Sequence, residues 1–255
     1  RIGSKFLYPG CGYGGSCFPK DVKALIKTAE KKGYEMKVLK AVEEVNEKQK
    51  SVLFNKLRDF YQGDLQGRTI ALWGLAFKPE TDDMREATSL VTIKLLLEAG
   101  CKVRVYDPVA MNECKRRIGN VVTYTENLYD CADGADALLL MTEWRQFRLP
   151  TWNVIQKVMT DKYIVDGRNI WNRVELEEMG FSFLGAIDMT GLVMVSAGIT
   201  LANIILPKQK GEAAVALPGC IINICFGTFV EASYPFMFSN KIVFAGALAS
   251  ATVGG

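Results

Sequence analysis

The sequence has 255 residues, of which 49% are hydrophobic and 23% charged, and this composition excludes a disordered or collagen-like chain. The net charge of +3 comes without a local basic stripe, so nothing in the sequence indicates nucleic-acid binding. No histidine is present, which excludes Ser-His and Cys-His dyads and HExxH zinc sites; we expect no metal site, and any catalysis must use Cys, Lys, Asp, Glu, Tyr or water.

A glycine-rich segment lies near the start of the chain. Residues 10–15 read Gly-Cys-Gly-Tyr-Gly-Gly and match the dinucleotide-binding pattern G-x-G-x-x-G literally. That pattern needs a strand before it and an acid at the end of a second strand about 20 residues later, and neither is predicted here. The glycines instead predict a backbone that a ligand can approach closely, turning into a helix at residues 18–21.

Cys17 lies at the predicted start of this helix. Unpaired amide groups and the helix dipole favour a thiolate at such a position, and Lys20 adds a nearby positive charge. We therefore predict that Cys17 is a nucleophile. Asp21 follows one turn later on the same face, where it can act on a water or hydroxyl beside the sulfur.

The seven cysteines have no CxxC or other regular spacing, which predicts reduced thiols in a cytoplasm rather than a disulfide framework. The role of Cys11 stays open at this point. Apart from Cys17, the others are interpreted as small buried hydrophobes: Cys101, Cys114, Cys131, Cys220 and Cys225.

Two helices are predicted after the glycine-rich segment. Residues 21–32 carry apolar side chains at helical spacing and end at Gly33, a typical C-cap residue. Residues 36–61 repeat the pattern and predict one helix well beyond the average globular length. Because a helix of this length with a continuous apolar stripe usually packs against a partner, we expect it to form a homodimer interface.

From residue 68 the pattern changes to short apolar runs that alternate with helical stretches. Strands are predicted at residues 69–75, 102–106, 137–141 and 163–165, and helices at residues 89–98, 110–117 and 152–159. This order predicts an α/β fold with a doubly wound, Rossmann-like parallel sheet, which holds nucleotides at the C-terminal ends of its strands. We divide the chain into a cysteine-loop and helical dimerisation domain (1–66), a sheet domain (67–187) and an apolar, helical tail (188–255).

The tail differs from the rest of the chain in composition. It carries only six charged residues, and residues 189–206 form an uncharged run of 18, roughly the minimum for a bilayer-spanning helix. Residues 215–237 form a second, mostly apolar stretch. We interpret residues 189–255 as a candidate membrane segment, with a buried hydrophobic core as the alternative.

Residues 12–21, Gly-Tyr-Gly-Gly-Ser-Cys-Phe-Pro-Lys-Asp, resemble the active-site motif of the UDP-glucose/GDP-mannose dehydrogenase family, in particular its UDP-glucose 6-dehydrogenase branch. Similar motifs follow in the family's order: Gly-Leu-Ala-Phe-Lys at 74–78, Thr-Asp-Asp-Met-Arg-Glu at 81–86, Tyr-Asp-Pro at 106–108, Thr-Glu-Trp at 142–144 and Asp-Gly-Arg at 166–168. The resemblance covers residues 1 to about 187, and GDP-mannose enzymes stay open as an alternative.

This resemblance implies an NAD-dependent oxidoreductase that converts UDP-glucose, or a related sugar nucleotide, to UDP-glucuronate for polysaccharide biosynthesis. It implies that Cys17 captures the aldehyde as a thiohemiacetal, later oxidised to a thioester, and that Asp21 assists the water that releases it. Arg85 would approach the cofactor, and Arg1 would reach the substrate of a neighbouring subunit. The substrate contacts implied by the resemblance come from Arg1, Phe6, Tyr8, Gly14, Phe77, Lys78 and Arg168.

The sequence departs from the family at both ends. The family's cofactor-binding Rossmann domain is expected before residue 1, so we expect this chain by itself to be inactive. The tail has no counterpart in the family and is only weakly similar to bacterial permease segments. Two alternatives therefore stay open: a nucleotide-sugar-binding and dimerisation module without catalysis, and a membrane transport component that acts through the tail.

Overall fold

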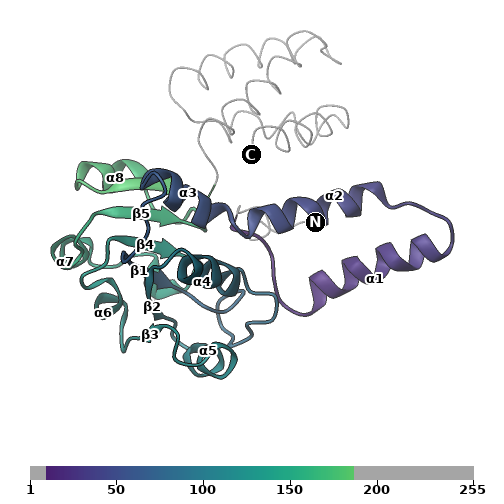
Figure 1. Cartoon of the computed structure of the whole chain (residues 1–255), viewed down its shortest axis with the longest axis horizontal. Coiled ribbons are helices and arrows are strands. Elements are labelled where there is room, and N and C mark those ends of the chain that lie inside the picture. The colour runs from purple at the N-terminus through teal and green to yellow at the C-terminus, as the bar shows by residue number, and fades with distance from the viewer. Residues whose placement is uncertain (1–9, 187–255) are drawn as a thin grey trace, which may run out of the picture. The chain divides into compact units, whose positions relative to one another are not determined.

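The computed structural model of the chain describes residues 10–186, which are built around one parallel β-sheet (Figure 1). Six strands pair in the order β3-β2-β1-β4-β5-β6, and every pair is parallel. This order confirms the predicted doubly wound sheet, with the change of direction between β1 and β4. The strands are β1 (Thr69–Trp73), β2 (Lys102–Tyr106), β3 (Thr123–Tyr124), β4 (Ala137–Leu140), β5 (Tyr163–Asp166) and β6 (Ser182–Gly185).

Two of these strands were not predicted, and both lie at the edges of the sheet. Strand β3 has two residues and β6 has four, of which the first, Ser182, is exposed. An edge strand this short carries too few apolar residues to give a recognisable run. The four predicted strands are the central ones. Of these, β1, β4 and β5 are buried almost throughout and consist of nearly continuous apolar residues, whereas β2 alternates buried valines with Lys102, Arg104 and Tyr106.

Helices cover both faces of the sheet. Ile70 and Leu72 of β1 belong to one buried core with residues of α3 (Val52–Phe60), α4 (Thr88–Glu98) and α5 (Met111–Ile118). Ala71 and Trp73 belong to a second core, with residues of α6 (Leu128–Ala132), α7 (Trp152–Val158) and α8 (Arg173–Glu178). The alternation follows from strand geometry, because successive side chains point to opposite faces.

Helices α1 (Cys17–Lys31) and α2 (Lys37–Gln49) form a hairpin that precedes the sheet domain (Figure 1). The predicted helix at 21–32 is confirmed, although it begins four residues earlier, at Cys17. The predicted single helix over residues 36–61 is wrong. It ends at Gln49, and α3 begins at Val52.

The interruption between α2 and α3 has a local and a tertiary cause. The Ser51 hydroxyl donates a hydrogen bond to the Lys48 carbonyl at 3.0 Å, which competes with regular helical bonding. The buried ammonium of Lys50 lies 3.2 Å from the Glu86 carboxylate, in the loop after β1. The apolar stripe continues across the interruption, which is why the sequence pattern did not reveal it.

Within residues 10–186, no helix combines the length and the apolar character that crossing a bilayer requires. The predicted apolar spans at residues 189–206 and 215–237 lie outside the described residues.

Candidate functional site

Loops from four neighbouring strands meet at the C-terminal edge of the sheet, and Asp107 fixes three of them. This residue follows β2 and is 1% exposed. Its Oδ2 accepts hydrogen bonds from the Leu75 amide at 2.7 Å and the Trp144 indole at 3.1 Å, and its Oδ1 accepts one from the Ala110 amide at 2.8 Å. One buried carboxylate therefore holds the loops after β1, β2 and β4 in register.

The glycine-rich segment, residues 10–15, crosses this edge. A Cβ atom on Gly10 would lie 2.7 Å from the Arg168 guanidinium, after β5. Cys11 donates to a carbonyl after β4, and a Cβ on Gly15 would lie 2.8 Å from the Phe77 ring, after β1. The segment thus needs glycine because its backbone packs directly against the loops of three strands.

Cys17 is the first residue of α1, as predicted, and its side chain is exposed. The Ser16 hydroxyl oxygen lies 3.7 Å from the sulfur. No side chain caps the helix and no acidic residue occupies its first turn, so the positive end of the helix dipole is not neutralised there. Lys20 and Asp21, both exposed, follow along the same helix.

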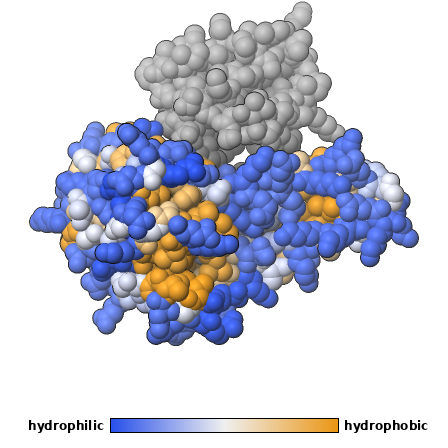
Figure 2. Space-filling model, in the orientation of Figure 1, coloured by the Kyte–Doolittle hydropathy of each residue, from blue (hydrophilic) through white to orange (hydrophobic). Residues whose placement is uncertain are grey.

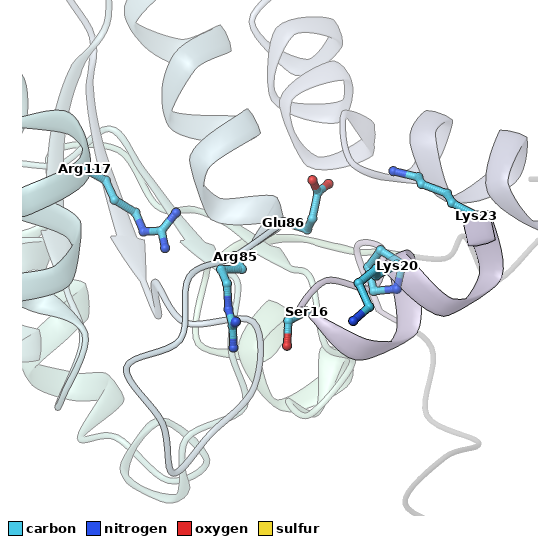
Figure 3. Close-up of a pocket in the computed structure, with 8 residues that line it drawn as sticks. Ser16, Lys20, Lys23, Arg85, Glu86 and Arg117 are labelled. Carbon is cyan, nitrogen blue, oxygen red and sulfur yellow. The ribbon is translucent and has the colours of Figure 1, made fainter.

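A cavity of about 380 Å³ lies beside this helix start. Ser16 and Lys20 lie close to Arg85 across it, with Glu86 above them in the view of Figure 3. The lining contains one acidic residue and four cationic ones: Lys20, Lys23, Arg85 and Arg117. This excess of positive charge suits an anionic ligand such as a phosphate group.

Arg85 is held in place by its neighbours. Its Nη2 lies 2.7 Å from the Asp83 carboxylate, and this hydrogen-bonded pair raises the pKa of Arg85 and lowers the pKa of Asp83. The Gly15 amide donates to the Arg85 carbonyl at 2.7 Å. The next residue, Glu86, has a φ of 53°, a left-handed conformation that a non-glycine residue keeps only where its surroundings impose it.

The two cations predicted to bind a sugar nucleotide lie on the same edge of the sheet but not side by side. Arg168 follows β5, and its Nε lies 2.7 Å from the Glu143 carboxylate, after β4. Lys78 is exposed in the loop after β1, with its ammonium 5.2 Å from the centre of the Phe77 ring. Strand β4 lies between their strands, so a ligand touching both must extend across β4.

The structure brings some of the predicted site residues together and leaves others undescribed. Cys17 directly follows Ser16, which lines the cavity together with Arg85. Gly14 packs against Phe77, whose Cβ would lie 3.2 Å from a Cβ on that glycine. Arg1, Phe6 and Tyr8 lie outside the described residues.

Sequence reasoning missed several residues that build this edge. Asp107 and Glu143 belong to the Tyr-Asp-Pro and Thr-Glu-Trp motifs, so the motifs marked their positions without revealing their contacts. Asn46, which bonds the glycine-rich segment, gave no signal at all, since a lone asparagine on an amphipathic helix is usually solvated.

The other described cysteines are buried, which confirms the interpretation of Cys101, Cys114 and Cys131 as small hydrophobes. Burial raises the pKa of Cys101 to about 11 and that of Cys131 to about 12. Cys11, left open by the sequence, is also buried, and burial raises its pKa. Cys220 and Cys225 lie outside the described residues.

Two family models match the chain. Residues 1–48 match the central domain of the UDP-glucose/GDP-mannose dehydrogenase family, and residues 71–173 match the UDP-binding domain of the same family.

Individual proteins agree with this match. The UDP-glucose 6-dehydrogenase of Pseudomonas aeruginosa is 50% identical over 190 residues, which cover 72% of this chain and 42% of that protein. UDP-glucose 6-dehydrogenase TuaD of Bacillus subtilis is 39% identical over 183 residues, covering 72% and 40%. The solved structure of a UDP-glucose dehydrogenase from the archaeon Pyrobaculum islandicum aligns with a TM-score of 0.60 at 39% identity, covering 67% of this chain and 38% of that one. The chain thus spans about two fifths of the length of the curated relatives it matches.

Proposed function

The chain belongs to the UDP-glucose/GDP-mannose dehydrogenase family, and on this premise we propose that it forms the central and UDP-binding parts of an NAD-dependent UDP-glucose 6-dehydrogenase. Such an enzyme oxidises the primary alcohol of the sugar to a carboxylate and acts in the cytoplasm. The observation that carries the proposal is the exposed Cys17 thiol at the uncapped start of α1, beside a cavity lined by cations.

Cys17 would act as the nucleophile. Its thiolate would add to the carbonyl carbon of an aldehyde, forming a carbon–sulfur bond while the carbonyl oxygen takes up a proton from water. After oxidation to a thioester, water would attack the same carbon, the carbon–sulfur bond would break, and the thiolate would leave. Asp21, one turn along α1, would orient that water and accept its proton.

The sheet edge would bind the sugar nucleotide. Arg168 supports a role in binding because its guanidinium is held against Gly10 by the Glu143 carboxylate and so has a fixed position at low entropic cost. Phe77, packed on Gly14 and Gly15, and the neighbouring Lys78 would contact the sugar. Arg1, Phe6 and Tyr8 would complete the site from the preceding segment, Arg1 in a neighbouring subunit.

The residues around the cavity fit the diphosphate of NAD. Arg85, already oriented by Asp83, and Lys20 would supply charge-assisted hydrogen bonds to its oxygens. When bound, NAD supplies the hydride acceptor for the oxidation of the alcohol and of the thiohemiacetal.

Calorimetry with UDP-glucose tests the substrate site. We expect the full chain to bind, and Arg168→Ala and Lys78→Ala each to weaken binding about tenfold, the loss of one charge-assisted hydrogen bond. Arg173→Ala is the matched control, because Arg173 pairs with Glu177 on α8 and should leave binding unchanged. If the wild-type chain binds UDP-glucose and both variants bind it equally well, the substrate binds elsewhere.

A second candidate is a nucleotide-sugar-binding and dimerisation module without catalysis, and the match of residues 71–173 to a UDP-binding domain is the observation that favours it. An NADH assay with UDP-glucose separates the two. Supplying the N-terminal domain of a relative as a separate protein should produce two NADH per UDP-glucose with the wild-type chain. With Cys17→Ser it should produce at most the first of them, from oxidation of the alcohol. Formation of both by Cys17→Ser at the wild-type rate would remove the nucleophile assignment.

A further inference from the structure

One residue of α2 holds both backbone groups of one residue in the glycine-rich segment. The Tyr13 amide donates a hydrogen bond to Asn46 Oδ1 at 2.8 Å, and Asn46 Nδ2 donates to the Tyr13 carbonyl at 3.4 Å. Asn46 is 5% exposed and is the one buried residue of α2. The Asn46 carboxamide therefore supplies the hydrogen bonds that the Tyr13 N–H and C=O would otherwise make within a strand or helix.

The same side of α2 makes further bonds to the segment. One turn before Asn46, Glu43 accepts a hydrogen bond from the Tyr13 hydroxyl. Near the end of the helix, Gln49 Nε2 donates to the Gly10 carbonyl at 2.9 Å. Residues at this spacing share one helix face, so α2 presents a row of polar groups to the segment.

Tyr13 connects this row to the start of α1. Its ring packs edge-on against the ring of Phe18, with centroids 4.8 Å apart. Phe18 is the neighbour of Cys17 in the first turn of α1, and that turn has no side-chain cap of its own. The contact of Tyr13 with Phe18 thus supplies a tertiary anchor where the usual local one is absent.

The segment has a particular need for such an anchor. Four of its six residues are glycine, which loses more conformational freedom on ordering than any other residue. Gly12 has a φ of 105°, and a Cβ on it would lie 3.2 Å from Asn46 Oδ1, so the asparagine and the glycine fit each other.

We propose that Asn46 is a positioning residue for Cys17: it fixes the backbone of Tyr13, and Tyr13 fixes the first turn of α1 that carries the thiol. The inference rests on the proposed function, because a fixed thiol matters to a nucleophile. With the first turn held, the thiol keeps its place beside the uncapped amide groups at the start of α1. The charged groups near this turn are Lys20, Asp21 and Lys23 on α1 and Arg85, Glu86 and Arg117 opposite, and Asn46→Ala neither adds nor removes a charge among them.

Alkylation of the full chain with iodoacetamide, mapped by peptide mass over a range of pH, tests the proposal. In Asn46→Ala we expect Cys17 to react about fivefold more slowly at neutral pH, because the turn that carries the thiol is no longer held through Tyr13 and Phe18. Asn46→Asp, which keeps the acceptor for the Tyr13 amide, should recover most of the wild-type rate. Gln49→Ala, which removes the bond to Gly10 alone, should slow the reaction about twofold and provides the test if Asn46→Ala does not fold.

Gln156→Ala is the matched control. Gln156 is a helical amide that donates to a backbone carbonyl, that of Met179, and its helix α7 packs on the opposite face of the sheet from α3 and α4. It should lower thermal stability as Asn46→Ala does and leave the Cys17 profile unchanged. A wild-type profile in both Asn46→Ala and Gln49→Ala would overturn the positioning role alone. If wild-type Cys17 reacts no faster than in the urea-unfolded chain, the nucleophile assignment and the positioning role both fail.

Discussion

The sheet domain and the α1–α2 hairpin meet at the candidate site but are stabilised in different ways. In the sheet domain, apolar side chains such as Leu138 and Ile70 are fully buried on both faces of the sheet. In the hairpin helices, the buried residues are Pro19 and Asn46. Hydrophobic side chains are exposed along it (Figure 2): Phe18, Leu25, Tyr34, Val38, Val42 and Val45.

The hairpin is therefore ordered by contacts at its ends rather than by a hydrophobic core of its own. Polar groups of α2 bond the glycine-rich segment, and Lys50 pairs with Glu86 of the sheet domain. The apolar surface left over is what a second copy of the chain would cover, and we propose that it forms the homodimer interface.

The largest effect should come from truncating the sheet core. Leu138→Ala should lower the free energy of unfolding by about 3 kcal/mol, because a fully buried leucine leaves a cavity. Leu25→Ala is the matched change in the hairpin, and at 50% exposure its cost should stay below about 0.5 kcal/mol. Urea unfolding followed by far-ultraviolet circular dichroism measures both, since helices of both regions contribute to that signal. Equal losses would contradict the comparison.

A smaller effect is expected from charging the exposed stripe of α2. Val38 and Val42 lie one turn apart on the same face. If this face is the dimer interface, Val38→Glu with Val42→Glu should raise the dissociation constant of the dimer about 100-fold, equivalent to about 2.7 kcal/mol. Light scattering at tens of micromolar measures it. Val109→Glu, an exposed valine of the sheet domain, is the control, and a wild-type chain that is monomeric would remove the interface.

The smallest effect separates the thiols of the two regions. Burial raises the pKa of Cys131 to about 12, from 9.0 for an ordinary thiol, so the unfolded chain loses this proton first as pH rises. The protonated thiol contributes its full share to the free energy of unfolding below pH 9, and this share decreases as the pH rises toward 12. Between pH 8 and pH 10 the free energy of unfolding should fall by about 1.4 kcal/mol.

Urea unfolding at these two pH values checks this expectation. Cys131→Ala should lose that part of the pH dependence, whereas Cys17→Ala, which alters the exposed thiol of the hairpin, should keep it. The same pH dependence in wild type and Cys131→Ala would show that the buried thiol is not its source.

Sequence patterns were enough to predict the central strands and to place Cys17 near the start of a helix, although α1 begins four residues before the predicted range. These features depend on short-range properties: a strand buried on both faces must be apolar throughout, and a helix start is set by the residues around it. The family motifs likewise marked residues 106–108 and 142–144 before any contact of Asp107 or Glu143 was known.

How these segments pack together depends on contacts between residues that are far apart in the chain. The path of the glycine-rich segment across three strand ends, the burial of Asn46 and Asp107, and the interruption after Gln49 all depend on groups distant in the chain. The sequence pattern around a polar side chain is the same whether that side chain is solvated or bonded to a distant backbone group. Asn46, for example, accepts a hydrogen bond from the Tyr13 amide, 33 residues away. Asn46 stabilises the fold because burying the Tyr13 backbone groups without hydrogen-bond partners would cost free energy. This penalty arises only when folding removes water from those groups.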